Sequence, residues 1–291
     1  MGAQALQFVA AGLTAGSIYA LVALGFSIVF NASKVINFAQ GEFVMIGGMA
    51  AASLSAAGAP LAVALPLAIV VAAAIGLLLE KLTIERAGRA DVTTLIIITI
   101  GASIFLRGIA QLVWGKGIRS LPPLTGDRPI ELGGVTILPQ SLWVLGATLV
   151  IVAALSWFFG RTRLGHAMLA TSHNRLAAQL VGIDVRLVLF ASFGLAAALG
   201  AVAGVLIAPI AFTSYDAGVM LGLKGFAAAI LGGLGNFHAA IVGGLVLGLL
   251  ESLGAGFVSS AYKDAISFVV ILAVLFVRPD GLLGVLRSER V

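Results

Sequence analysis

The sequence predicts an all-α, polytopic integral membrane protein, and three observations support that prediction. Hydrophobic residues make up 60% of the 291 residues and charged residues only 10%. The mean hydropathy is +1.15. Soluble domains are about half apolar and a quarter charged, so this chain cannot cover itself with polar surface. Apolar segments near the length of about 20 residues that crosses a bilayer recur along the chain. We expect about eight apolar helices in one transmembrane domain, residues 1–291.

Several segments are apolar over a length that suits one full crossing. They lie at residues 4–30, 61–79, 92–113, 141–159, 187–208 and 259–277. Glycines four positions apart, Gly12 with Gly16 and Gly200 with Gly204, predict that other helices approach closely at these points. No Lys or Arg precedes Lys34, so the first segment lacks the basic start of a cleavable signal peptide. We therefore expect it to remain as a span.

Two further apolar segments are predicted to be broken or re-entrant. The first covers residues 31–57, where a polar interruption precedes an apolar helix at 43–57 that is short for a crossing. The second covers residues 225–257, which are too many for one ordinary crossing and include the sequence GGLGN at 232–236. Irregular backbone at membrane depth is tolerated only where protein or a water-filled path surrounds it. Both breaks are therefore candidates for a transport path.

The polar connections are expected to be loops, including a charged loop at 80–91 and another at 209–223. The connection at 114–140 is long and rich in proline. Within it, the apolar residues Ile130 and Leu132 alternate with a polar residue, and Gly133 and Gly134 follow. The apolar residues Val135 and Ile137 then alternate in the same way. This pattern predicts a small β-hairpin.

The longest stretch of mixed polarity runs from residue 161 to 186, inside a loop assigned to 160–187. Its pattern predicts two short helices. Thr162 is placed to cap the first, and Ser172 or Asn174 to cap the second. Gly182 is expected to end the second helix, and Asp184 to cap the element that follows. Such an amphipathic segment between two spans can serve as a binding surface for a partner protein.

The distribution of Lys and Arg predicts which end of the protein faces the cytoplasm. The 80–91 loop, the 161–186 loop and the C-terminal tail contain three, four and three basic residues, against three in the 114–140 loop. The positive-inside rule therefore places the first three in the cytoplasm and the 114–140 loop in the periplasm. The tail can lie in the cytoplasm only if residues 225–257 enter and leave on one side. The basic residues form no face with stacking aromatics, which argues against nucleic-acid binding.

The sequence contains no motif that indicates catalysis. It has no cysteine and no phosphate-binding P-loop, and its three histidines lack metal-ligand spacing. We therefore expect no catalytic residues, no metal, no cofactor and no enzymatic activity. Glu42, Glu251 and Arg107 are ionisable residues within or beside apolar segments, and each is either functional or part of the helix packing.

The chain resembles the permease subunits of bacterial ABC importers for branched-chain amino acids over nearly its whole length. The stretches that carry the resemblance are GSIYALVALGF at 16–26, VINFAQGEF at 35–43, GLKGFAAAILGGLGN at 222–236, SSAYKD at 259–264 and RPDGL at 278–282. Gln40 stands where this family usually has His. Residues 176–182, LAAQLVG, are similar to the coupling motif of ABC importers, with Leu176 where many have Glu.

The resemblance implies a transport role and a set of partners. The chain is expected to be a multi-pass protein of the bacterial cytoplasmic (inner) membrane that pairs with a second, related permease in a heterodimer. Two cytoplasmic ATPase subunits and a periplasmic or lipid-anchored substrate-binding protein complete such an importer. The expected solute is a branched-chain or other small neutral amino acid, which passes inward by alternating access.

The resemblance and the residue pattern together suggest two sets of site residues. The expected ATPase-coupling residues are Arg163, Gly165, Met168, Arg175, Ala177, Ala178, Leu180 and Gly182. The expected translocation-path residues are Asn37, Gln40, Glu42, Gly232, Gly233 and Asn236. The hairpin around Gly133 is expected to face the binding protein.

Other functions are compatible with parts of this pattern. One alternative is a stand-alone channel or secondary transporter for a small neutral solute, and urea or a short amide is a further possible ABC substrate. A membrane enzyme that acts on lipid-linked substrates is disfavoured, because no carboxylate, histidine or metal cluster is evident.

Overall fold

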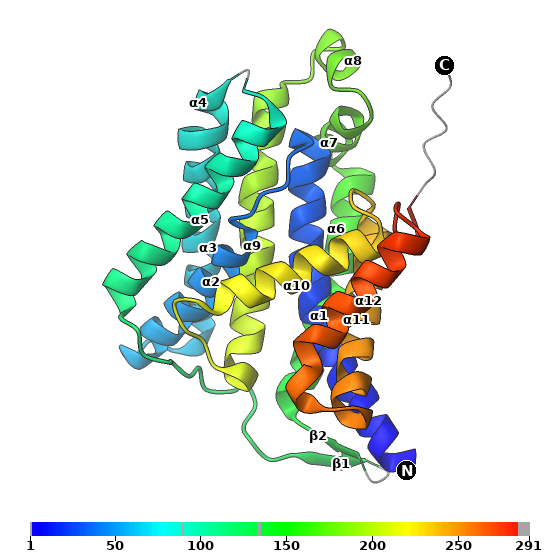
Figure 1. Ribbon diagram of the computed structural model, residues 1–291. Helices are drawn as coiled ribbons and strands as arrows, with labels where there is room; N and C mark the ends of the chain where they lie inside the picture. Colours follow the sequence, from blue (N-terminus) through cyan, green and yellow to red (C-terminus); the bar gives the residue numbers. More distant parts are fainter. Residues whose placement is uncertain (1, 89, 133–134, 285–291) are drawn as a thin grey trace.

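The computed structural model describes residues 2–88, 90–132 and 135–284, and nearly all of its regular structure is helical. Figure 1 shows a bundle in which several long helices run between two opposite ends. The N-terminus and a short hairpin lie at one end, and two short helices, α7 (Arg163–His173) and α8 (Arg175–Leu180), project at the other.

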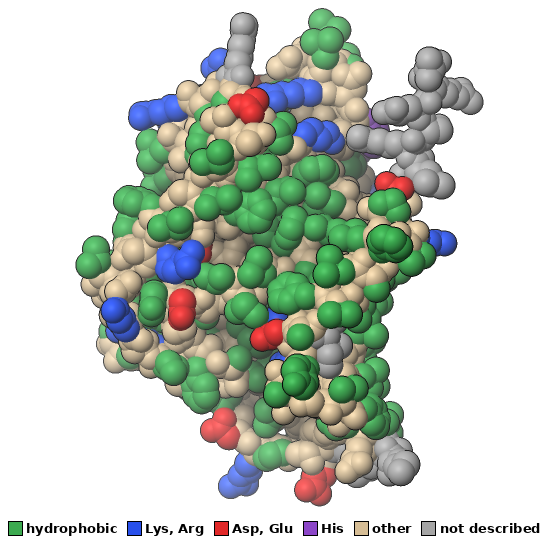
Figure 2. Space-filling view, in the orientation of Figure 1, with side chains coloured by type: hydrophobic (Ala, Val, Ile, Leu, Met, Phe, Trp, Pro, Cys, Tyr) green, Lys and Arg blue, Asp and Glu red, His purple; other side chains and the backbone are tan. Residues whose placement is uncertain are grey.

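The described residues contain seven helices that are long and apolar enough to cross a membrane. They span Gln4–Ser33, Leu61–Ala87, Val92–Trp114, Pro139–Arg161, Val185–Ala211, Phe237–Phe257 and Ser260–Val277, and a shorter apolar helix covers Ala217–Gly232. The prediction of an all-α polytopic fold with about eight apolar helices is thus confirmed. Many side chains that face outward from these helices are large and apolar, and hydrophobic side chains cover much of the face in Figure 2.

The centre of the bundle is formed by α1 (Gly2–Ser33) and α9 (Val185–Ala211), whose middle residues are almost all buried. Small residues let other helices approach them. A Cβ on Gly16 would lie 2.9 Å from the carbonyl oxygen of Gly244 in α11 (Phe237–Phe257). A Cβ on Gly204 would lie 1.9 Å from the carbonyl oxygen of Val44 in α2 (Gln40–Ala56). Both predicted glycine pairs therefore mark close helix contacts.

Two predicted loops are wrong. The charged loop at 80–91 begins as helix: α3 (Leu61–Leu79) continues through a π-helical turn, η1 (Glu80–Ile84), into α4 (Glu85–Ala87). Residues 80–87 contain neither Gly nor Pro, so nothing local stops the helix before Gly88, whose φ is +58°. The loop at 209–223 is also shorter than predicted, because α9 extends to Ala211 and α10 (Ala217–Gly232) begins soon afterwards.

The predicted break in residues 225–257 is present as a turn between α10 and α11. The two helices form a hairpin, and the side-chain amide of Asn31 at the end of α1 donates to the carbonyl oxygen of Gly235 in the turn over 2.7 Å. From the hairpin the chain enters α12 (Lys263–Val277), which runs back beside α11 (Figure 1). That the two ends of the hairpin lie on one side of the membrane stays a prediction from the charge distribution.

The predicted β-hairpin is also present, as β1 (Ile130–Leu132) and β2 (Val135–Ile137), and its turn at Gly133 and Gly134 lies outside the described residues. The strands are antiparallel, with Ile130 opposite Ile137. Gln7 of α1 holds β2 through both ends of its amide, since its Nε2 donates to the carbonyl oxygen of Thr136 over 2.7 Å and its Oε1 accepts from the Thr136 amide over 2.8 Å.

The remaining long helices cover the sides of this core. They are α5 (Val92–Trp114) and α6 (Pro139–Arg161). Few residues of α5 are buried, and Figure 1 shows this helix at the margin of the bundle. One face of α5 therefore borders an open groove.

Candidate translocation groove and coupling segment

The segment 161–186 folds as its sequence predicts. The Thr162 hydroxyl accepts from the amide of Gly165 over 3.0 Å and caps α7. Asn174, rather than Ser172, caps α8 by accepting from the amide of Ala177 over 3.0 Å. Gly182 ends the helix with a φ of +87°, and the Asp184 carboxylate caps α9 through the amides of Arg186 and Leu187. These caps set the ends of the short helices through local interactions.

The expected coupling residues divide into an exposed and a buried set. Exposed residues are Arg163, Arg175, Ala177, Leu180 and Gly182. Buried residues are Gly165, Met168 and Ala178. A Cβ on Gly165 would lie 2.2 Å from the carbonyl oxygen of Phe158, so this glycine lets α7 pack closely on the end of α6. The buried residues thus support the segment, while the exposed residues form its surface.

The exposed side of α8 is apolar. The relative exposures of Leu176, Leu180 and Val181 are 67%, 80% and 77%. The segment is also tied to the core, because Lys34 beyond α1 donates to the carbonyl oxygen of Ser172 over 2.8 Å. This bond joins α7 to the residue that follows α1.

A groove of about 320 Å³ lies between α5 and α10. One wall is aromatic: the rings of Phe26 and Phe38 lie 5.5 and 5.6 Å from that of Phe226, measured between centroids. At its floor α2 crosses α10, where a Cβ on Gly41 would lie 2.2 Å from the carbonyl oxygen of Gly218. The groove combines a mostly apolar lining with a few polar groups, as small-molecule sites do.

The polar groups of the groove are Glu42, Ser103 and Arg107. The Ser103 hydroxyl donates to Oε1 of Glu42 over 2.7 Å, and Nε of Arg107 lies 3.5 Å from the same oxygen. Glu42 is 2% exposed and Arg107 is 31% exposed. Arg107 therefore forms an ion pair with the buried carboxylate of Glu42. Its side chain points into the groove between the helices.

Asn37 and Gln40 precede Glu42 and are fully buried. Nε2 of Gln40 donates to the carbonyl oxygen of Ala196 in α9 over 2.9 Å, and Oδ1 of Asn37 accepts from the amide of Ala39. Among the described residues, Nδ2 of Asn37, Oε1 of Gln40 and Oε2 of Glu42 have no hydrogen-bond partner. Buried polar atoms usually find a partner, so a water could bind beside these atoms. Glu42 lines the groove, whereas Asn37 and Gln40 lie behind it and are not among its lining residues.

The other expected path residues, Gly232, Gly233 and Asn236, lie elsewhere. They form the turn between α10 and α11, where Gly233 has a φ of +127° and Asn236 caps α11 through the amides of His238 and Ala239. They are not among the residues that line the groove. The amides of Leu282 and Leu283 donate to the carbonyl oxygens of Leu231 and Gly232, so the turn holds the end of the described chain.

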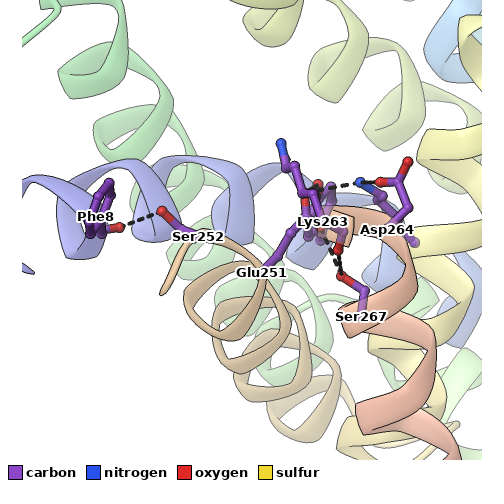
Figure 3. A network of polar contacts seen from close by, with 8 residues as sticks. Phe8, Glu251, Ser252, Lys263, Asp264 and Ser267 are labelled. Atoms are coloured by element: carbon purple, nitrogen blue, oxygen red, sulfur yellow. Dashed lines mark hydrogen bonds and ion pairs between the residues drawn. The ribbon is translucent and has the colours of Figure 1, made fainter. Parts of the chain in front are cut away.

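A buried charge network forms around Glu251, which the sequence singled out without its partners. Its Oε1 lies 3.0 Å from Nζ of Lys224 and 3.0 Å from Nζ of Lys263. Figure 3 shows Lys263, Asp264 and Ser267 of α12 gathered around this carboxylate of α11. The Tyr19 hydroxyl of α1 donates to Glu251, and Lys224 of α10 also pairs with Asp264. The network therefore joins α1, α10, α11 and α12.

Membrane-capable helices, a partly polar groove between them and a projecting helical segment define a multi-pass membrane protein of the permease type. Among the residues that the structure describes, no group of His, Cys, Asp and Glu could hold a metal ion. The model of the family described as "Branched-chain amino acid transport system / permease component" matches residues 8–275. The chain belongs to this family.

Individual relatives agree with the family assignment. The chain is 35% identical to the high-affinity branched-chain amino acid transport system permease protein LivH of Escherichia coli K12, and the alignment covers 98% of this chain and 97% of LivH. It is 32% identical to the corresponding permease protein BraD of Pseudomonas aeruginosa, with 98% of each chain covered. It is 27% identical to the ribose import permease protein RbsC of Escherichia coli K12, with 90% of this chain and 82% of RbsC covered. The resemblance seen in the sequence is thus confirmed.

Proposed function

We propose that this chain is the membrane-spanning permease subunit of an ABC importer in the bacterial cytoplasmic membrane. Its solutes are branched-chain or other small neutral amino acids, as the names of LivH and BraD suggest. Partner chains hydrolyse ATP, and a periplasmic or lipid-anchored binding protein delivers the solute. The similarity to RbsC is weaker, so an amino acid is preferred over a sugar.

The observation that carries the proposal is the exposed apolar side of α8. Leu176, Leu180 and Val181 project from a capped, well-defined helix at the end opposite the N-terminus. Apolar side chains held in this way favour contact with another protein. Arg163 and Arg175 are exposed on the same segment and add positive charge. A stand-alone channel or secondary transporter has no need of such a surface.

The groove between α5 and α10 supports the path of the solute. Its aromatic wall suits an aliphatic side chain, and Glu42, Ser103 and Arg107 offer charged and hydrogen-bonding groups for an ammonium and a carboxylate. The groove is open on one side, and a second, related permease in a heterodimer is the proposed cover. Asn37 and Gln40 lie beside Glu42 with unpaired polar atoms, which favours a role in the same path.

The proposed mechanism is alternating access. Closure of the two ATPase subunits moves α8, and the contact of α7 with α6 together with the bond from Lys34 to Ser172 transmits the movement to the core. Such coupling requires that the partners contact the permease differently in its two states. The turn at Gly232, Gly233 and Asn236 is a proposed hinge, because it joins α10 of the groove to α11.

Co-purification tests the proposal directly. The chain is expressed with its candidate partners, and ATP-driven uptake of leucine, isoleucine and valine is measured in proteoliposomes. Ala177→Asp alters the exposed side of α8, and Arg128→Gln on the 114–140 loop is its control. We expect Ala177→Asp to abolish ATPase association and uptake. Leucine uptake by this chain alone, driven by a gradient without ATP, would refute the proposal.

A further inference from the structure

A second cavity, larger than the groove, lies at the end of the molecule that carries α8. Its volume is about 740 Å³, within the range of about 300–1,000 Å³ that is usual for small-molecule sites. It is lined by η1 and α4 on one side and by α8 on the other, with the start of α9 between them. Figure 2 shows acidic and basic side chains together at this end of the molecule. We call this cavity the end cleft.

One side of the end cleft offers carboxylates that the fold leaves unused. Glu80 is 2% exposed, and its Oε2 has no hydrogen-bond partner among the described residues. Glu85, one turn further on, is exposed and makes no ion pair within the described part of the chain. Asp184 also lines the cleft, but its carboxylate already caps α9. Burial of a carboxylate oxygen without a donor is costly, so a cation or hydrogen-bond donor that reached Glu80 from the cleft would be bound favourably.

The other side of the end cleft offers cations. Arg175 begins α8 and Arg186 lies in the first turn of α9, and both line the cleft. Both residues are exposed, and their guanidinium groups form no ion pair with any described residue. Guanidinium groups bind carboxylates through paired hydrogen bonds. Opposite charges thus face one cavity from different elements without meeting each other.

Polar groups make up most of the lining of the end cleft, and a smaller part of it is apolar. Ile84 and Leu189 are buried, and Leu95 is half-buried, at the cleft wall. Ile84 belongs to the π-helical turn that also presents Glu80, and such turns frequently occur at functional sites. An aliphatic side chain bound here would bury apolar surface, which provides a favourable contribution near the two charged sides.

We propose that the end cleft binds a free α-amino acid with an aliphatic side chain. Glu80 holds its ammonium group, Arg186 or Arg175 holds its carboxylate, and Ile84, Leu95 and Leu189 contact its side chain. The choice of an amino acid rests on the proposed function, and the cleft is separate from the groove at Glu42. A bound amino acid would contact η1, α8 and α9 at the same time. The transported product would thus bind directly at the coupling segment, from the cytoplasmic side.

The same chemistry, a primary ammonium beside an anionic group, also occurs in the headgroup of phosphatidylethanolamine. The free amino acid is favoured because Glu80, whose Oε2 has no hydrogen-bond partner among the described residues, lines a cleft of about 740 Å³ together with Arg175 and Arg186, and that volume is usual for small-molecule sites. The measurement therefore begins in nanodiscs of phosphatidylcholine, whose quaternary ammonium has no N–H to donate. Nanodiscs containing phosphatidylethanolamine form the second arm.

The test measures equilibrium binding of radiolabelled L-leucine to the membrane complex of permeases and ATPases, without the binding protein and without ATP. Glu80→Gln and Arg186→Gln are each expected to weaken binding about tenfold or more, because each removes one charge-assisted contact. Asp127→Asn and Arg128→Gln, exposed on the 114–140 loop before the hairpin, are expected to bind as the unaltered protein does. Isoamylamine and 4-methylpentanoate, which each lack one charge, are expected to compete poorly.

Equal binding by all four variants, or equal competition by the singly charged analogues, would overturn the proposal. Loss of leucine binding on adding phosphatidylethanolamine would assign the cleft to the lipid headgroup and would also overturn it. Thermal unfolding and uptake in the presence of the binding protein show whether each variant is folded. If the variants keep ATP-driven uptake and bind leucine as the unaltered protein does, the end cleft is not an amino-acid site. The proposed transport function would still hold in that case.

Discussion

Nζ of Lys224 lies 3.0 Å from Oε1 of Glu251, and the two side chains are only 8% and 1% exposed. The pair joins α10 to α11, and Lys263 and Asp264 extend it to α12. Taking charges out of water is costly unless each one is paired, so these helices depend on one another for a neutral interior. The network thus joins the helices that follow α9 to one another, and through Tyr19 to α1.

Removal of the central carboxylate is expected to destabilise this region strongly. Glu251→Gln leaves Lys224 and Lys263 with Asp264 as their remaining acid in the network. Loss of one partner from a buried pair costs about 3–5 kcal/mol. We expect a clear fall in the midpoint of thermal unfolding in detergent. Lys263→Gln is the matched control, because Lys263 is 48% exposed and partly exposed pairs contribute only about 0–1 kcal/mol. Equal midpoints for the two variants would contradict the assignment.

The contact between α2 and α10 yields a second prediction. Gly41→Ala places a methyl group where it would lie 2.2 Å from the carbonyl oxygen of Gly218 and 2.9 Å from Cα of Gly222. The helices must separate, and overpacking of this kind costs about 1–3 kcal/mol. We expect lower thermal stability and slower uptake.

Gly101→Ala is the control for Gly41→Ala. Gly101 lies within α5 and a Cβ there meets nothing within 4 Å. Alanine in a helix interior is favoured over glycine by about 0.5–1 kcal/mol, so this variant is expected to be at least as stable as the unaltered protein. If Gly41→Ala behaves like Gly101→Ala, the two helices do not need their close contact.

Much of the helical framework could be predicted from the sequence because its causes are local. Residues 61–79 form α3 with the predicted bounds, and Thr162 and Asp184 cap the helices that they precede. The helix through 80–87 differs from the predicted loop because the charge of these residues does not stop a helix. In fact these residues favour helix, and the charge only marks the end of the apolar crossing.

The partners of buried polar residues could not be predicted in the same way. Tyr19 is 232 positions from Glu251, and Ser103 is 61 positions from Glu42. Periodicity fixes which face of a helix a residue occupies but not which helix lies opposite. The cleft at Glu80 could not be predicted for the same reason, because its lining comes from η1, α4, α8 and α9. Glu80, an acidic residue directly after the apolar segment 61–79, is the signal that the sequence offers.

Two adjacent alanines of α8 are expected to respond differently to the same change. Ala178 is buried and Ala177 is exposed. Ala178→Asp places a charge inside the packing of the segment, and we expect lower thermal stability as well as loss of ATPase association. Ala177→Asp is expected to lose ATPase association with an unchanged unfolding midpoint. Pull-down of the ATPase subunits and thermal unfolding measure the two effects, and a stable Ala178→Asp variant would show that the segment is more loosely packed than the structure indicates.

The charges of the groove are expected to be coupled. Arg107→Gln leaves the carboxylate of Glu42 with Ser103 as its hydrogen-bond donor, and Glu42→Gln leaves Arg107 facing a neutral amide. Each single variant is expected to lower the unfolding midpoint. The double variant removes both charges, so it is expected to be more stable than the sum of the single effects predicts, by a coupling energy of about 0.5–3 kcal/mol. All three variants are expected to bind the ATPase subunits and to slow uptake, because the groove is the proposed path. Additive losses of stability would show that the 3.5 Å approach of Arg107 to Glu42 contributes no coupling, and unchanged uptake would place the path elsewhere.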